Sequence, residues 1–84
     1  MNYTVFILRR AQNELAHLPT ETYEQIRDAV RALSLKPRPP GCLKLTDRKG
    51  WRIRLGDYRV IYEIDDDQHT VTLLHVGHRR DVYR

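Results

Sequence analysis

The stretch from Trp51 to Ile64, WRIRLGDYRVIYEI, is the feature that most constrains how this chain can fold. Apolar and charged residues alternate on both sides of a Gly-Asp pair, and side chains along a β-strand point alternately to opposite faces. Glycine readily adopts the positive φ that mirror-image hairpin turns need at their first position. We therefore predict two antiparallel strands joined by a two-residue turn at Gly56-Asp57.

This turn determines which side chains lie opposite each other. Counting outward from it pairs Leu55 with Tyr58 and Arg54 with Arg59. One face then carries the apolar residues Trp51, Ile53, Leu55, Tyr58, Val60 and Tyr62, and the other carries Arg52, Arg54 and Arg59. Opposed residues have Cβ atoms about 5 Å apart, and like charges at that distance are destabilising. A protein tolerates such a pair if it stays hydrated, and can use it if an anion binds. We therefore expect Arg54 and Arg59 to lie side by side on an exposed, candidate anion-binding face.

The remaining segments predict a strand, two helices and a further strand. β-branched and aromatic residues indicate a strand at Tyr3–Leu8. Ala11, Leu15 and Leu18 follow at helical spacing and end before Pro19. A second helix is expected to begin near Thr20 as its N-cap. Its apolar stripe is Tyr23, Ile26, Val30 and Leu33.

The second helix is expected to end at Lys36–Gly41, where three prolines and a glycine cannot continue it. Leu43 and Leu45 are expected to tuck this connection against the core. A polar turn at Asp65–His69 precedes a last strand at Thr70–Val76.

These elements predict an α+β fold in a single domain, residues 1–84. An N-terminal strand and an αα-hairpin precede a three-stranded antiparallel meander, with the helices on one face of an antiparallel sheet. The expected core brings the helix residues Ile26, Val30 and Leu33 against the apolar hairpin face, namely Trp51, Ile53, Val60 and Tyr62.

Positive charge gathers in the middle of the chain. The net charge is +4, but Lys36–Arg54 holds seven basic residues and one acid, Asp47. The acids Asp65–Asp67 fall at the far end of the hairpin strand from Arg59. A basic stripe of this kind suits a phosphate partner. It equally suits a solvated surface that keeps the protein soluble, and charge alone leaves both interpretations open.

Several other classes of site lack the residues they need. His75 and His78 form an H-x-x-H pair, but one cysteine and no nearby carboxylate pair leave too few ligands for zinc, so we expect His75 to be an ordinary strand residue. Cys42 lies beside a Pro-Gly turn with no obvious base, and no phosphate-binding glycine loop is present. We expect no metal and no cofactor.

The cellular location follows from what the sequence lacks. No apolar run approaches the roughly 20 residues of a membrane span, and the start lacks the features of a signal peptide. A single cysteine suits a reducing compartment. We therefore expect no association with a membrane and a location in the cytoplasm.

The C-terminal tail completes the candidate site. Gly77 is expected to mark where the backbone leaves the sheet, and the last strand should return His78, Arg79, Arg80 and Tyr83 towards the hairpin. RNA cleavage through the 2′-hydroxyl needs a base for that hydroxyl, cations for the phosphorane and an acid for the 5′-oxygen. Arginine supplies the cations through fixed donors. In the alternative interpretation these are surface arginines, and Tyr83 is an ordinary packing anchor.

The run WRIRLGDYRVIYEIDDD, followed by VTLLHVGHRRDVYR, resembles the RelE branch of the RelE/ParE toxin superfamily over essentially the whole chain. The resemblance implies a toxin of a type II toxin–antitoxin system with a microbial-ribonuclease-like sheet. It further implies an endonuclease that cuts mRNA on the ribosome and that a cognate antitoxin holds inactive, with a heterotetramer as one form of that complex.

The resemblance also implies a set of site residues. Arg52 and Arg54 match two basic catalytic positions, and Arg59, Arg79 and Tyr83 match three more. We expect Lys44, Arg48, Lys49 and Arg80 to contact substrate.

One departure concerns proton transfer. The best-known members have lysine at positions 52 and 54, and arginine stays charged above pH 12, so it is a poor general base. The base role then falls to His78 or Tyr83. Two alternative functions stay open: a ParE-like inhibitor of DNA gyrase, and a catalytically weak relative that acts as a binding module.

Overall fold

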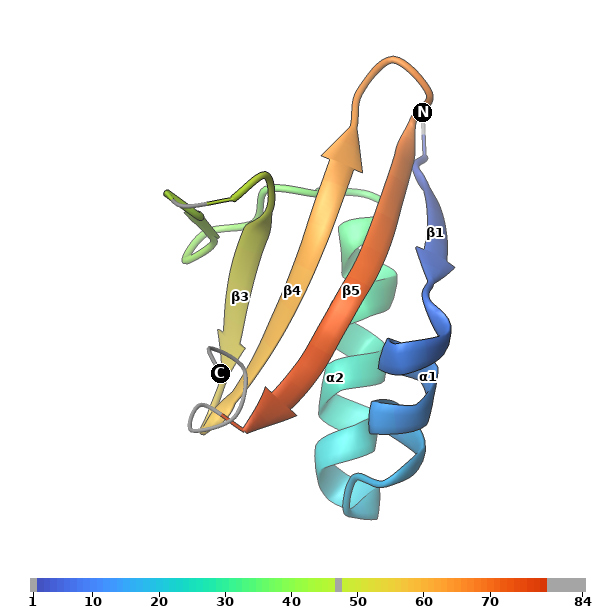
Figure 1. Ribbon diagram of the computed structural model, residues 1–84, viewed down its shortest axis with the longest axis vertical. Helices are drawn as coiled ribbons and strands as arrows, with labels where there is room; N and C mark the ends of the chain where they lie inside the picture. Colours follow the sequence, from blue (N-terminus) through green and yellow to red (C-terminus); the bar gives the residue numbers. More distant parts are fainter. Residues whose placement is uncertain (1, 47, 79–84) are drawn as a thin grey trace.

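The computed structural model describes residues 2–46 and 48–78, which form two helices and one five-stranded sheet. The elements in chain order are β1 (Thr4–Ile7), α1 (Arg9–Ala16), α2 (Thr20–Leu33), β2 (Leu43–Lys44), β3 (Trp51–Leu55), β4 (Tyr58–Asp65) and β5 (Thr70–His78). The strand order is β1-β5-β4-β3-β2 (Figure 1). The α+β fold class is therefore confirmed.

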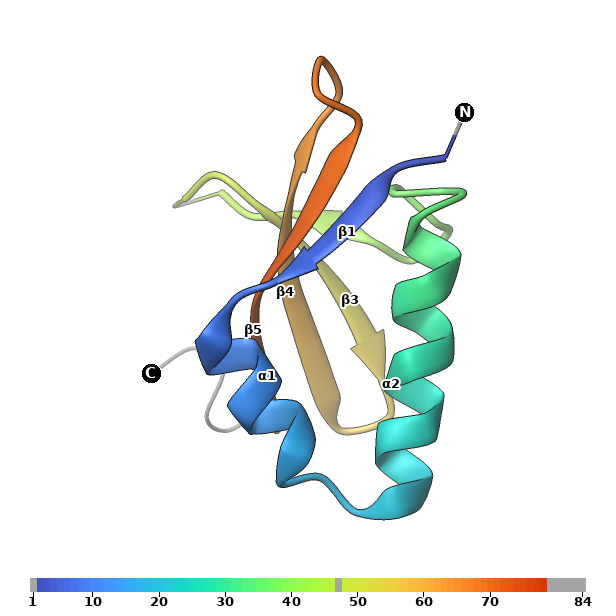
Figure 2. The same cartoon turned by 90° about the vertical axis from the view of Figure 1, so that its right-hand side faces the viewer.

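The two helices pack against one face and one edge of the sheet. α2 lies behind the sheet in Figure 1, whereas α1 runs alongside β5 and continues from β1 (Figure 2). Within the described residues, neither helix is both long and apolar enough to cross a membrane.

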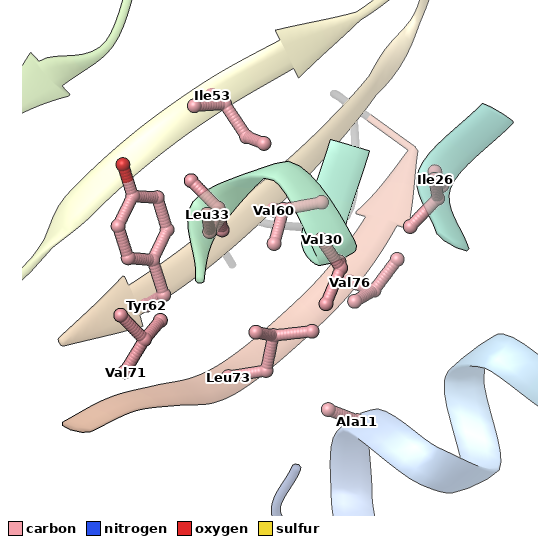
Figure 3. Packing of buried hydrophobic residues seen from close by; sticks show 10 residues of the cluster. All are labelled: Ala11, Ile26, Val30, Leu33, Ile53, Val60, Tyr62, Val71, Leu73 and Val76. Carbon is pink, nitrogen blue, oxygen red and sulfur yellow. The ribbon is translucent and has the colours of Figure 1, made fainter. Parts of the chain in front are cut away.

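The core forms where the apolar stripe of α2 meets the sheet (Figure 3). Ile26, Val30 and Leu33 are buried, as the helical spacing predicted, whereas Tyr23 of the predicted stripe is 39% exposed. They pack with the sheet residues Ile53, Val60, Tyr62, Val71, Leu73 and Val76. Trp51 is half-buried against this cluster. The predicted contact between α2 and the apolar hairpin face is confirmed.

The β3–β4 hairpin has the predicted register. Leu55 pairs with Tyr58 and Arg54 with Arg59, which leaves Gly56 and Asp57 as the turn. Gly56 has a φ of 61°, in the left-handed region where only glycine is free of a steric penalty.

The sheet is mixed rather than wholly antiparallel. β1 pairs in parallel with β5, and the short strand β2 extends the other edge beside β3. The outer edge of β5 exposes backbone groups that need partners, and β1 supplies them because the helical hairpin is long enough to allow a parallel crossover. Pairing in β2 leaves Leu43 54% exposed, so the expectation that it tucks against the core was wrong.

Two predicted boundaries also differ. Thr20 is the first residue of α2 and Pro19 is its N-cap, since the Pro19 carbonyl already accepts a hydrogen bond from the Tyr23 amide. Gly77 does not leave the sheet: β5 continues to His78, and Gly77 pairs with Arg59. The amides at the start of β4 thereby gain partners.

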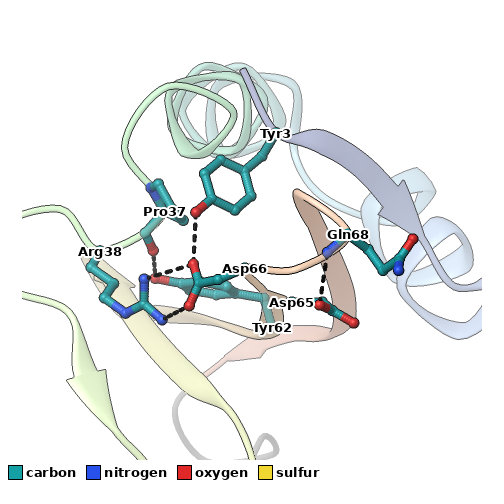
Figure 4. A network of polar contacts seen from close by, with 7 residues as sticks. All are labelled: Tyr3, Pro37, Arg38, Tyr62, Asp65, Asp66 and Gln68. Atoms are coloured by element: carbon teal, nitrogen blue, oxygen red, sulfur yellow. Dashed lines mark hydrogen bonds and ion pairs between the residues drawn. The ribbon is translucent and has the colours of Figure 1, made fainter. Parts of the chain in front are cut away.

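A polar network ties the loops together at the opposite end of the sheet from the Gly56 turn (Figure 4). Asp66 accepts hydrogen bonds from Arg38 at 2.9 and 3.3 Å and from the Tyr3 hydroxyl at 2.6 Å. The Arg38 guanidinium, followed by the Tyr3 hydroxyl, lowers the pKa of Asp66 to about 2. Burial raises the pKa of Tyr62, whose hydroxyl donates to the Pro37 carbonyl at 2.7 Å.

Candidate functional site

Arg52, Arg54 and Arg59 share one face of the β3–β4 hairpin, termed here the arginine face. Arg54 is the direct partner of Arg59, and Arg52 that of Ile61. The residues between them in sequence, such as Ile53 and Val60, belong to the core cluster. Because side chains alternate along a strand, the arginine face points away from α2. The alternation in the sequence predicted this grouping correctly.

The three guanidinium groups differ in their exposure to solvent. Arg54 is exposed and Arg52 is half-buried, whereas Arg59 is only 6% exposed. The expectation that Arg54 and Arg59 both lie on an open face was therefore wrong for Arg59. Sequence alternation identifies the face of a strand, but it cannot show how deeply a side chain lies within that face.

Arg59 is incompletely paired among the residues that the structure describes. Its Nη1 donates to the Tyr58 carbonyl at 3.2 Å and, over a longer 3.4 Å, to the Gly56 carbonyl. Its Nε is buried without a hydrogen-bond partner there. Buried polar groups are nearly always paired, and an unpaired N–H on a charged group is costly. The Arg59 guanidinium therefore keeps hydrogen-bonding capacity for a further acceptor.

The other basic residues that the sequence predicts for the site lie elsewhere. Lys44 pairs with Trp51 and shares its core-side face, with the ammonium 5.7 Å from the indole centroid. Arg48 and Lys49 are exposed in the loop before β3, at the other end of that strand from Arg54. Of the seven basic residues in the stripe, Arg38 is neutralised by Asp66. Arg79, Arg80 and Tyr83 lie outside the described residues.

The two histidines of β5 occupy unexpected faces. His78 pairs with Tyr58, and the two rings meet edge to face at 5.7 Å. Tyr58 packs against the core cluster, so the register puts His78 on the opposite side of the sheet from the arginine face. His75, expected to be an ordinary strand residue, pairs with Ile61 and lies on the arginine face.

A β-bulge explains why the sequence pattern did not place His75 on the arginine face. The register between β4 and β5 shifts between Ile61 and Tyr62, so that Leu74 is an extra residue in β5. Simple alternation from Leu73 would have put His75 on the core side. One inserted residue reverses the face of everything after it, and nothing in the local sequence marks the position.

Comparison with known proteins identifies the family. A model described as the ParE toxin of the type II toxin–antitoxin system parDE matches residues 5–83. The chain belongs to the ParE toxin family. This toxin is 52% identical over 84 residues to the toxin RelE of Mycobacterium tuberculosis, covering 98% of the chain and 87% of the relative. It is 36% identical to the toxin RelG of the same organism, covering 100% of the chain and 99% of the relative.

Solved structures agree on the fold and on the branch. The RelBE2 toxin–antitoxin complex from M. tuberculosis superposes with a TM-score of 0.83 at 30% identity, covering 94% of this toxin and 100% of that chain. The archaeal RelE–RelB complex from Pyrococcus horikoshii superposes with a TM-score of 0.85 at 29% identity, covering 96% and 99%. The predicted RelE-like branch of the RelE/ParE superfamily is confirmed, and the chain is a RelE-type toxin of a type II toxin–antitoxin system.

Proposed function

We propose that this toxin is an endoribonuclease that cleaves mRNA on the ribosome, with Arg54 and Arg59 holding the phosphate that is cut. One observation carries the proposal: two arginines are direct cross-strand partners, and the buried one has an N–H without an acceptor among the residues that the structure describes. Such a pair costs stability in the free protein, and a bound phosphate would offset that cost.

The chemistry assigned to the arginine face is electrostatic. Attack by the 2′-hydroxyl places extra negative charge on the phosphorane oxygens, and fixed guanidinium donors stabilise that charge without a metal ion. Arg52, two residues before Arg54 on the same face, adds a third positive charge.

Proton transfer needs a different group because arginine does not deprotonate at physiological pH. In this proposal Arg79 adds a further charge and Tyr83 acts as base or acid. The pairing of His78 with Tyr58, on the other face, counts against His78 as the base.

The partners follow from the related proteins. The matched structures from M. tuberculosis and P. horikoshii are complexes of a RelE toxin with a RelB antitoxin. We propose that a cognate antitoxin likewise inhibits this toxin, with a heterotetramer as one assembly. In this proposal the toxin acts in the cytoplasm, where it meets ribosomes and mRNA.

Single-turnover cleavage of mRNA on programmed ribosomes, mapped by primer extension, tests the proposal. Arg54→Ala and Arg59→Ala should each lower the rate about 100- to 1000-fold, as expected for the loss of one charged donor in a preorganised site. Arg59→Lys should recover only part of the rate, because lysine keeps the charge and loses the planar fork. Arg9→Ala, at an exposed arginine that begins α1, is the matched control and should cleave normally.

The same samples test a second candidate function, inhibition of DNA gyrase, because the matching family model is described as the ParE toxin. If the wild-type toxin leaves mRNA intact but blocks supercoiling by DNA gyrase, the endoribonuclease proposal is wrong. If it does neither and still binds ribosomes, the toxin is a binding module.

A further inference from the structure

The outer edge of β5 loses its strand partner halfway along its length. The β1–β5 pairing ends at Ile7 and Leu73, with a last hydrogen bond from the Leu8 amide to the Leu73 carbonyl at 3.1 Å. Beyond this point the chain turns into α1, and Glu14 of that helix takes over. Its Oε1 accepts a hydrogen bond from the Val76 amide at 2.9 Å. A side chain thus replaces the missing strand.

The second carboxylate oxygen of Glu14 holds the neighbouring side chain of β5. Its Oε2 lies 2.5 Å from Nδ1 of His75 and 3.6 Å from Nε of Arg10. The contact between Oε2 and Nδ1 of His75 is close, but it does not have the geometry of a hydrogen bond. Nη2 of Arg10 in turn lies 3.4 Å from Nε2 of His75, which is 6% exposed. Glu14 therefore contacts the backbone and a side chain of β5 at adjacent positions.

The segment that Glu14 holds borders Arg59 directly. Gly77 follows Val76 and is the cross-strand partner of Arg59, so Arg59 lies between Arg54 on β3 and Gly77 on β5. Movement of the end of β5 would change the surroundings of the buried guanidinium. Val76 pairs with Val60 of β4 along one edge of β5, and Glu14 contacts its amide on the outer edge.

We propose that Glu14 is a positioning residue, which fixes the end of β5 and through it the orientation of Arg59. Its effect on cleavage rests on the proposed endoribonuclease function, but its effect on Arg59 does not. In catalysis, misplacing a reacting group by about 1 Å can cost on the order of 100-fold in rate. A contact on the far side of β5 can therefore control the arginine face without touching substrate.

Hydrogen exchange and side-chain NMR test the anchor without any activity assay. In Glu14→Ala, the Val76 amide should exchange at least ten times faster, while the Val60 amide keeps its protection. The ¹⁵Nε resonance of Arg59 should shift or broaden. Glu14→Gln keeps an oxygen acceptor for the amide and should restore both signals. Glu24→Gln, at an exposed position on α2, is the matched control and should change neither.

Single-turnover cleavage tests the functional consequence. Glu14→Ala should lower the rate at saturation by at least tenfold with little change in KM, and Glu14→Gln should recover most of it. If Glu14→Ala does not fold, Glu14→Asp is used instead, because its carboxylate is one methylene shorter and should fail to reach Val76.

Each outcome decides between the two proposals. An unchanged Val76 amide or an unchanged Arg59 resonance in Glu14→Ala overturns the positioning role. A full cleavage rate when both signals have changed overturns the control of cleavage by Glu14, although Glu14 then still positions Arg59. If the wild-type toxin does not cleave mRNA, the endoribonuclease proposal fails, and the Arg59 resonance alone decides whether Glu14 positions it.

Discussion

Arg54 and Arg59 should repel each other in the free toxin, and this repulsion should be measurable as a coupling free energy. They are direct partners, so their Cβ atoms lie about 5 Å apart, and guanidinium groups at the ends of such side chains can sit on the order of 7 Å apart. At 7 Å two like charges repel by about 0.6 kcal/mol at a dielectric constant near 80, and by about 2.4 kcal/mol near 20. Arg54 is exposed and Arg59 is buried, which places the pair between these limits. We expect about 1 kcal/mol.

A double-mutant cycle on unfolding in urea isolates this term. Methionine keeps much of the arginine side-chain length without its charge, so Arg54→Met, Arg59→Met and the double variant complete the cycle. Each single substitution relieves the same repulsion. The double variant should therefore be less stable than the sum of the single effects predicts, by about 1 kcal/mol. An equivalent cycle between Arg54 and the exposed Arg9 is the control and should give a coupling near zero.

Ionic conditions supply the second half of this test. Raising the salt concentration from 0.1 to 1 M shortens the screening length from about 10 to 3 Å, so the coupling should shrink. Inorganic phosphate at constant ionic strength should stabilise the wild-type toxin more than Arg54→Met. A coupling free energy of zero at low salt, or one that shows attraction, would refute the conclusion that Arg54 and Arg59 repel each other in the free toxin and that a bound anion reduces this repulsion.

Three further predictions concern stability. The pKa of the Asp66 carboxylate is lowered to about 2, below its value of about 3.9 in the unfolded chain. The ionised carboxylate therefore adds to the free energy of unfolding above pH 4, and this contribution is lost as the pH falls towards 2. The urea midpoints of wild type and Asp66→Asn should therefore converge over that range, whereas Asp67→Asn should follow wild type throughout. Gly56→Ala should destabilise by about 1 kcal/mol in thermal unfolding, since a Cβ there meets no atom and only the φ of 61° is unfavourable; Gly56→Asn should cost less. Tyr62→Phe should lose about 1 kcal/mol with its hydrogen bond, and an unchanged melting temperature would contradict this.

The hairpin could be predicted because its determinants are local. Alternation from Trp51 to Leu55 selects the faces, and Gly56 supplies the one backbone conformation that a two-residue turn requires. A shift of one residue would bury arginines and expose the core residues, so the register has no close competitor. The pairing of Arg54 with Arg59 follows from these few residues. The apolar stripe of α2 was readable for the same reason, since its helical spacing is a property of one short segment.

What the tertiary structure decided depends on contacts between distant parts of the chain. The parallel pairing of β1 with β5 joins Thr4 to Thr70, and Glu14 reaches Val76 across 62 positions. The bulge in β5 that turns His75 onto the arginine face exists only in the register with β4. The burial of Arg59 likewise depends on its place between two neighbouring strands. Local patterns specify which way a side chain points, whereas its depth, its partners and its unpaired N–H depend on which segments pack beside it.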